Sequence, residues 1–213
     1  MARAATYMRV AAGARGLLSG QNLATYSEDL NNGAWAKSSC AITTGAAAPP
    51  SGVLSADKLL GTAAGSYLYA SKSVGGLKVG TRYTYSAYVQ YGNCQYVFFS
   101  CPNDTSTPIF DVQNGVFGTV PAGIESYSAV SVGGGWYRVR FTFVAATTTG
   151  THSVGLSKTS GAISFGGTAL GTEYAFFCGL QVVIANWAGP YVKTTASAID
   201  ARLRNIATNR VTP

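Results

Sequence analysis

Hydrophobic and polar residues alternate along short stretches of this chain, which is the pattern of strands that bury one face. The alternation is clearest over residues 82–91 and 136–145. The residues expected to face inward from these two strands are Tyr83, Tyr85, Ala87, Val89, Tyr91, Tyr137, Val139, Phe141 and Phe143. A third stretch, QYVFFS at 95–100, is apolar on both faces, as a central strand would be. These positions predict the core of a β protein.

Further strands are expected at 67–74, 151–157 and 173–184, with turn residues between them. Asn114-Gly115, between two short apolar runs, is the strongest hairpin signal in the chain. No pattern between residues 22 and 190 favours a helix. Short strands separated by turns predict an all-β fold, an antiparallel β-sandwich. Its buried aromatic residues are expected to be Trp35, Tyr83, Tyr85, Tyr137, Phe141 and Phe143.

Length and composition agree with one domain of this class. The chain has 213 residues, enough for one sizeable core, and charged residues make up only 11% of it. A typical globular domain carries about 25% charged residues, so outer faces rich in Thr, Ser and Tyr are expected instead. The apolar run at 174–192 is interrupted by glycine, glutamine, asparagine and proline. It therefore predicts a strand, a turn and a second strand, and no membrane contact is expected.

The positive charge lies mainly at the two ends of the chain. Of the net charge of +7, residues 1–21 carry +3, residues 199–213 carry +2, and the remaining middle carries +2. Two basic arms on a nearly neutral body indicate docking segments rather than a basic binding face. Nucleic acid is not an expected partner, because the arms are not dense in Lys or Arg and contain no recognised binding motif.

Three segments follow from these patterns: an N-terminal basic arm at 1–21, a β-sandwich at 22–195 and a C-terminal tail at 196–213. In the tail, Ile199, Leu203 and Ile206 recur at i, i+4 and i+7, the spacing of a short amphipathic helix. A helix this short needs a surface to lie on. The residues expected to dock on partners are Arg3, Arg9, Arg15, Leu17, Leu18, Ile199, Leu203 and Ile206.

Candidate catalytic groups are few. Glu28 and Asp29 are adjacent, and in an extended segment their side chains point to opposite faces, which does not suit a catalytic pair. His152 is the lone histidine and lies on an alternating strand, where a structural role is the usual one. No nucleophile elbow, P-loop or dinucleotide fingerprint occurs. We expect no enzymatic activity, no catalytic residues and no cofactor.

The four cysteines, Cys40, Cys94, Cys101 and Cys178, have no C-x-x-C spacing, and the lone histidine is far from them in sequence. No metal site is therefore expected. We interpret the cysteines as small buried hydrophobic residues. A bridge between Cys94 and Cys101 across a hairpin remains an open alternative.

Glycan binding is the chemical function that the pattern favours most. Aromatic rings on a sandwich face can stack on sugar C–H surfaces, and polar neighbours can then fix the orientation. Alternation places Trp136, Arg138 and Arg140 opposite the core face of their strand, and Tyr88 opposite the core face of 82–91. These four are the glycan-binding candidates. The alternative is structural, since a partner or an arm can cover either face of a sandwich.

Four stretches, taken in order, resemble a known family. NLATYSEDLNNGAWAKSS (22–39) resembles the opening signature of jelly-roll domains in virion proteins of tailed bacteriophages. KVGTRYTYSAYVQYG, VGGGWYRVRFTFVA and EYAFFCGLQVVIANWAGPYVKTT resemble three later strands of that family. Together they span 22–195. The family is similar in fold to carbohydrate-binding modules, and its members occur on phage head spikes, head fibres and tail parts.

The resemblance implies a jelly-roll sandwich in which Trp35 anchors the first strand and Glu28 and Asp29 lie in a polar entrance. Similar carbohydrate-binding modules pair an acid in this entrance with an acid on the last strand to hold calcium. Here Val182 and Val183 stand on that strand, so calcium is not expected.

Two functions follow from the resemblance. The first is a structural virion protein, a compact decoration or anchor on the head or head–tail region. Its expected partners are capsid, portal, collar or tail subunits and further copies of itself, in a trimer or a higher ring. The alternative is a glycan-binding module for host surface polysaccharide.

Overall fold

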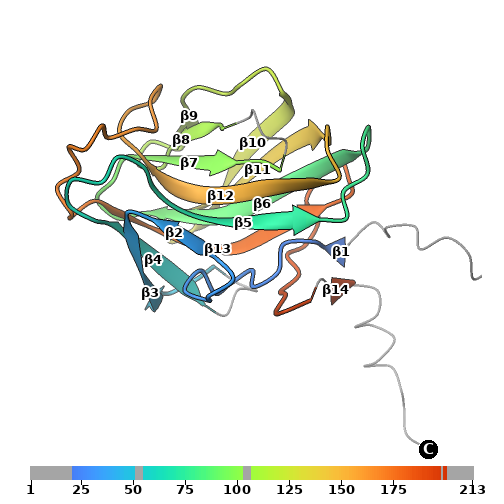
Figure 1. Cartoon of the computed structure of the whole chain (residues 1–213), viewed down its shortest axis with the longest axis horizontal. Coiled ribbons are helices and arrows are strands. Elements are labelled where there is room, and N and C mark those ends of the chain that lie inside the picture. The colour runs from blue at the N-terminus through green and yellow to red at the C-terminus, as the bar shows by residue number, and fades with distance from the viewer. Residues whose placement is uncertain (1–20, 51–54, 103–106, 198, 201–213) are drawn as a thin grey trace, which may run out of the picture.

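The structure, a computed structural model, describes residues 21–50, 55–102, 107–197 and 199–200. Two six-stranded sheets are stacked face to face, and a short two-stranded ribbon lies beside them (Figure 1). The first sheet is formed, in spatial order, by β10 (Ile124–Gly133), β11 (Trp136–Val144), β6 (Arg82–Tyr91), β13 (Tyr174–Val183), β4 (Ala56–Gly61) and β3 (Cys40–Ala47). The second is formed by β2 (Ala36–Ser38), β5 (Leu68–Gly75), β12 (Thr149–Ser157), β7 (Tyr96–Ser100), β8 (Ile109–Asp111) and β9 (Val116–Phe117). The ribbon pairs β1 (Gln21–Asn22) with β14 (Ile199–Asp200).

All strand pairs are antiparallel, and the predicted fold class is confirmed. The chain passes between the two sheets from β4 to β5, from β5 to β6, from β6 to β7, and again around β12. As a result β4-β13-β6-β11 faces β5-β12-β7-β8, which is the strand order of a jelly roll. The described residues contain no helix that is long and apolar enough to span a membrane.

Aromatic residues fill the space between the sheets. Trp35, Tyr83, Tyr85, Phe141 and Phe143 are all buried, as the alternation predicts. Two inward predictions are wrong: Tyr91, the last residue of β6, is exposed, and Tyr137 is only partly buried. Tyr137 lies at the side of the core. Its ring contacts Phe110 near the β8–β9 hairpin, toward the margin of the sandwich (ring centroids 5.4 Å apart).

The predicted hairpin at Asn114-Gly115 is present between β8 and β9. Gly115 has a φ of +72°, a conformation that glycine adopts without strain. The Asp111 carboxylate accepts hydrogen bonds from the backbone and the side-chain amide of Asn114, both at 2.9 Å. The turn is therefore held by its own side chains.

The tail differs from the expectation at the two residues that can be compared. Ile199–Asp200 is a strand paired with Gln21–Asn22, not the start of a helix. Pairing with β1 satisfies backbone groups that an isolated short helix would leave to water. The rest of the expected helix lies outside the described residues.

All four cysteines are free thiols. Cys94, Cys101 and Cys178 are buried and Cys40 is half-buried, in agreement with their interpretation as small hydrophobic residues. Burial raises the pKa of the Cys94 thiol to about 11. These thiols are therefore protonated at neutral pH and poorly nucleophilic.

His152 lies in the core. Its side chain is fully buried against Trp35 and Tyr85, with ring centroids 4.9 and 5.6 Å away. Neither ring nitrogen has a hydrogen-bond partner. Burial, helped by the charge of Lys72, lowers the pKa of His152 from 6.5 to about 3. The imidazole is neutral in the folded protein, so its role here is packing.

We expect His152 to make the fold sensitive to acid. Its pKa is lower in the folded than in the unfolded chain, so its contribution is present above pH 6.5 and is lost as the pH falls toward 3. In that window the free energy of unfolding should fall by up to about 1.4 kcal/mol per pH unit because of this residue alone. His152→Leu should flatten the slope while changing stability little at pH 8, as measured by urea unfolding. An equal slope in the variant would contradict this account.

Candidate functional site

The chain closes on itself along one polar seam. We use closing seam for the contact between residues 22–28 and residues 180–182 and 191–195. Backbone hydrogen bonds join Leu23 N–H to Val182 O at 2.8 Å, Tyr26 N–H to Thr195 O at 2.9 Å and Leu180 N–H to Ser27 O at 3.0 Å. The beginning and the end of the sandwich are thereby joined directly.

Asn22 is fully buried in the seam and uses its whole amide. Its Nδ2 donates to Leu180 O at 3.0 Å and to Val192 O at 2.8 Å. Its Oδ1 accepts from Ala24 N–H and Val182 N–H, both at 3.0 Å. One side chain thus satisfies four backbone groups, two in β13 and two in the irregular segments.

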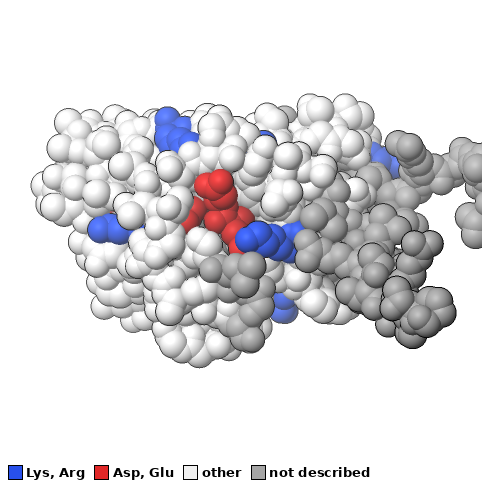
Figure 2. Space-filling view, turned by 90° about the horizontal axis from the view of Figure 1, so that it is seen from below, with Lys and Arg blue, Asp and Glu red and all other residues white. Residues whose placement is uncertain are grey.

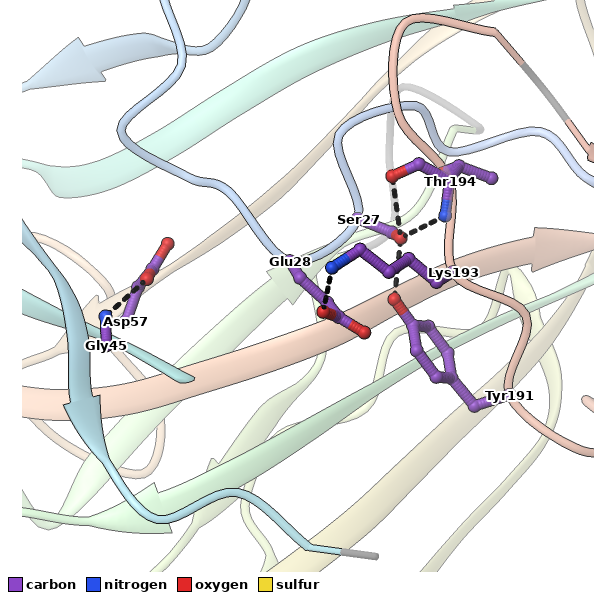
Figure 3. Close-up of polar contacts among 7 residues, drawn as sticks. All are labelled: Ser27, Glu28, Gly45, Asp57, Tyr191, Lys193 and Thr194. Atoms are coloured by element: carbon purple, nitrogen blue, oxygen red, sulfur yellow. Dashed lines mark hydrogen bonds and ion pairs between the residues drawn. The ribbon is translucent and has the colours of Figure 1, made fainter. Parts of the chain in front are cut away.

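Ser27 is the second polar centre of the seam (Figure 3). Its Oγ accepts the backbone N–H of Thr194 at 2.8 Å and lies 2.6 Å from the Tyr191 hydroxyl. Thr194 Oγ1 in turn donates to Ala24 O. Burial raises the pKa of the Tyr191 phenol well above its ordinary value, so this hydroxyl stays neutral.

Glu28 forms an ion pair across the same seam. Its Oε2 lies 2.8 Å from Lys193 Nζ, and its side chain is 2% exposed, against 36% for that of Lys193. The other carboxylate oxygen, Oε1, is buried without a hydrogen-bond partner. Figure 2 shows acidic side chains gathered in one patch, with basic atoms against its edge.

The neighbouring acids serve separate turns. Asp29 accepts from the backbone N–H of Asn32 at 3.0 Å and closes the turn before Trp35. Asp57 on β4 accepts from Leu30 N–H at 2.8 Å and Gly45 N–H at 3.3 Å, which ties the opening segment to β3. Burial is the main reason that the pKa of Asp57 is raised, and the charges of Asp29 and Glu28 add to it.

Glu28 and Asp29 border a hollow of about 470 Å³. It is lined by Tyr26, Glu28, Asp29, Thr44, Ser55, Lys193, Thr194 and Thr195. Among the residues that the structure describes, no group of three or more His, Cys, Asp or Glu side chains could hold a metal ion. The cation that contacts Glu28 is the ammonium group of Lys193, and this ion pair belongs to the closing seam.

The sequence-predicted glycan candidates do share one face, the outer face of the first sheet, and Arg138 is the register partner of Tyr88. This face is largely covered, however. Trp136 is 2% exposed and donates from its indole N–H to Ala48 O at 2.9 Å. Arg138 donates to Gly189 O at 2.6 Å, and the ring of Tyr88 packs edge-on against Tyr191.

Arg140 is the fourth candidate. It is partly buried, and its Nε has no hydrogen-bond partner. A hollow of about 400 Å³ borders Trp136 and is lined by Ala48, Pro49, Pro50, Gln90, Val132, Gly133, Gly134 and Trp136. The four candidates therefore form no open aromatic platform, and glycan binding through them stays a prediction.

Of the predicted docking residues, Arg3, Arg9, Arg15, Leu17, Leu18, Leu203 and Ile206 lie outside the described residues. Ile199 is placed by its backbone, in β14 opposite Asn22. Gln21 and Asp200 are register partners, so the segments that precede β1 and follow β14 are attached to the sandwich at one place.

A groove that the candidates above do not include lies on the outer face of the second sheet, across β5, β12 and β7. It has a volume of about 390 Å³ and is lined by Tyr67, Tyr69, Ser71, Phe98, Ser100, Cys101, Thr107, Thr151, Ser153 and Ile163. The alternation of Tyr67, Tyr69 and Ser71 is visible in the sequence and could have indicated it. The residues on β12 and β7 are brought beside them only by strand register.

Comparison with known proteins gives little beyond this geometry. No family model matches the chain, and no curated protein matches it. Among solved structures, the enzymatically active domain of tailspike protein 4 of bacteriophage CBA120 is similar, at 9% sequence identity and a TM-score of 0.48. The match covers 77% of this chain and 21% of the tailspike chain, so this chain spans about a fifth of that structure's length.

We predict that Lys193→Met destabilises the protein by roughly 1–3 kcal/mol, because it leaves the Glu28 carboxylate buried without its counter-charge. Adding Glu28→Gln to this variant should recover most of the loss, since the buried charge is then removed as well. Urea unfolding of both single variants and the double variant measures the coupling. Additive effects would show that the ion pair does not support the seam.

Asn22→Ala should lower the free energy of unfolding by roughly 2–4 kcal/mol, because it leaves buried N–H and C=O groups unpaired. The matched control is Asn31→Ala, at an exposed asparagine of the opening segment, which should change stability by less than about 0.5 kcal/mol. Equal effects of the two substitutions in chemical denaturation would argue against a special role for Asn22.

Proposed function

We propose that this chain is a structural component of a tailed-phage virion, a compact jelly-roll decoration or anchor protein on the head or head–tail region. The observation that carries the proposal is the pairing of Gln21 with Asp200. It attaches both terminal arms, which hold +5 of the net charge of +7, at one place on a nearly neutral sandwich. A single basic attachment point suits docking onto a larger assembly.

The four segments that resemble the phage family support the same proposal. The first runs through the closing seam to β2 and contains the buried Trp35. The others contain β6, β11 and β13, which are neighbours in the first sheet. Segments far apart in sequence thus form one continuous part of the sandwich, as expected for a shared fold signature.

A second feature suits lateral contact with neighbouring subunits. β10 is an edge strand of the first sheet, and its side chains Tyr127, Val130 and Val132 are exposed. Proteins usually protect such edges with charge, proline or a covering segment. In the proposed assembly, further copies of the chain or other capsid, portal, collar or tail subunits contact this edge, in a trimer or a higher ring.

The second candidate function is glycan recognition at the host surface. The observation that favours it is the groove lined by aromatic rings and hydroxyl groups on the second sheet. This function is compatible with a virion protein, since the groove and the paired strands β1 and β14 belong to different parts of the sandwich.

The virion proposal predicts that deleting residues 2–21 leaves a folded body that no longer enters particles efficiently. The variant keeps Asn22 and the closing seam, so its unfolding temperature should remain near that of the full chain. Incorporation into purified virions, measured by quantitative mass spectrometry, should fall at least severalfold. The matched control replaces Arg3, Arg9 and Arg15 with Gln. It removes the positive charge of the arm but keeps its length, so it shows which of the two incorporation requires.

Three results would contradict parts of this proposal. Absence of the chain from purified virions would reject the virion role. Undiminished incorporation of the truncated chain would reject docking through the N-terminal arm. An unfolded truncated chain would show that the arm belongs to the core and that the boundary at Asn22 is misplaced.

A further inference from the structure

The groove on the second sheet is built from two rows of side chains that cross three adjacent strands. Tyr69, Gly155 and Phe98 are register partners and form the first row. Ser71, Ser153 and Ser100 form the next row. The outer face of this sheet therefore carries an aromatic row beside a row of three hydroxyl groups.

Gly155 is the residue that makes the aromatic row possible. A Cβ at this position would lie 2.5 Å from the ring of Phe98 and 2.6 Å from Leu68 O, closer than real contacts allow. With glycine there, the rings of Tyr69 and Phe98 meet above the sheet in an edge-to-face contact, with centroids 6.1 Å apart. The floor of the groove is thus a fixed apolar surface.

Further hydroxyl groups and one open ring complete the lining. Ser100 Oγ lies 3.3 Å from Thr107 Oγ1, so these two hydroxyls are held close together. Thr151 lies on the same face of β12 and is exposed. The Tyr67 side chain is 46% exposed, which leaves ring surface at the rim available to a ligand.

The chemistry of the lining narrows the class of ligand. Among the residues that the structure describes, no Lys, Arg, Asp or Glu lines the groove, so these residues offer no counter-charge to an anionic or cationic ligand. A wholly apolar ligand would exclude water from the serine and threonine hydroxyls without replacing the hydrogen bonds to that water. A ligand with an apolar C–H face and many hydroxyl groups satisfies both rows. The volume of about 390 Å³ is near the small end of ligand sites, roughly 300–1,000 Å³.

We propose that this groove binds one or two units of an uncharged glycan, with a sugar ring stacked on Tyr67 and its hydroxyls bonded to the Ser71, Ser100 and Ser153 row. The inference rests on the second proposed function, glycan recognition, and places it on the opposite sheet from the four candidates that alternation favours. It does not depend on the virion role.

The test starts with the full chain on an array of defined neutral oligosaccharides and of acidic ones carrying uronic acid, sialic acid or sulfate. We expect binding to at least one neutral glycan and weaker or no binding to acidic ones. Titration calorimetry with the best neutral glycan should then show about a tenfold loss of affinity for Tyr67→Ala, the effect of removing one stacked ring. Ser71→Ala should also weaken binding.

Two controls locate the site. Tyr127→Ala removes a ring of similar exposure from β10 and should leave affinity unchanged. Arg140→Gln tests the rival candidates on the outer face of the first sheet. If the groove is the binding site, this substitution should leave the glycan affinity unchanged. Thermal unfolding of each variant separates loss of fold from loss of binding. Because Tyr67 is exposed, Tyr67→Ala is expected to fold normally.

The possible results distinguish failure of the groove as the binding site from failure of glycan binding itself. If the chain binds no glycan, both the groove and the glycan function are rejected, while virion incorporation stands or falls by its own test. If it binds a glycan equally well after Tyr67→Ala and Ser71→Ala but not after Arg140→Gln, the function survives and the groove is rejected. Preference for acidic glycans would overturn the proposed ligand class.

Discussion

The side-chain amide of Asn22 is the contact on which the architecture depends most directly. A jelly roll brings its first and last strands together, yet both are flanked here by irregular backbone whose polar groups need partners. Asn22 bonds four backbone groups at once, two in β13 and two in the irregular segments, and Ser27 and Glu28 continue the seam toward Thr194 and Lys193. The closed seam also determines where the segments before β1 and after β14 are attached.

The outer face of the first sheet is covered by a segment of the chain, whereas the outer face of the second sheet carries an open groove. The residues on the two faces explain this difference. On the first sheet, the buried guanidinium of Arg138 and the amide of Gln181 require acceptors, which the carbonyls of Gly189 and Ala188 supply. The segment after β13 therefore lies over this face. The groove on the second sheet instead presents serine, threonine and tyrosine side chains, and none of its described lining residues carries a buried charge that would require a covering segment. This asymmetry leaves the groove open to a ligand.

Much of the fold could be predicted because strand alternation is local. The buried residues from Tyr83 to Val89 and from Val139 to Phe143 on the inward face, the hairpin at Asn114-Gly115 and the burial of Trp35 follow from neighbouring residues. The cover over Trp136 and Arg138 could not be predicted, because Ala48 and Gly189 approach them from distant parts of the chain. The strand at Ile199–Asp200 has a similar cause, since it depends on a partner strand at Gln21–Asn22.

The groove is a feature that the alternation of residues along the chain does not predict. Tyr67, Tyr69 and Ser71 alternate visibly, but this says only that they share a face. The groove has this lining because antiparallel register sets Ser153 and Gly155 between β5 and β7, and because Gly155 has no side chain to separate the two rings. Any other residue at position 155 would push the ring of Phe98 aside with its Cβ, although the alternation of all three strands would be unchanged. Strand register and one glycine, rather than composition, therefore distinguish a groove of this kind from the ordinary polar face of a β-sandwich.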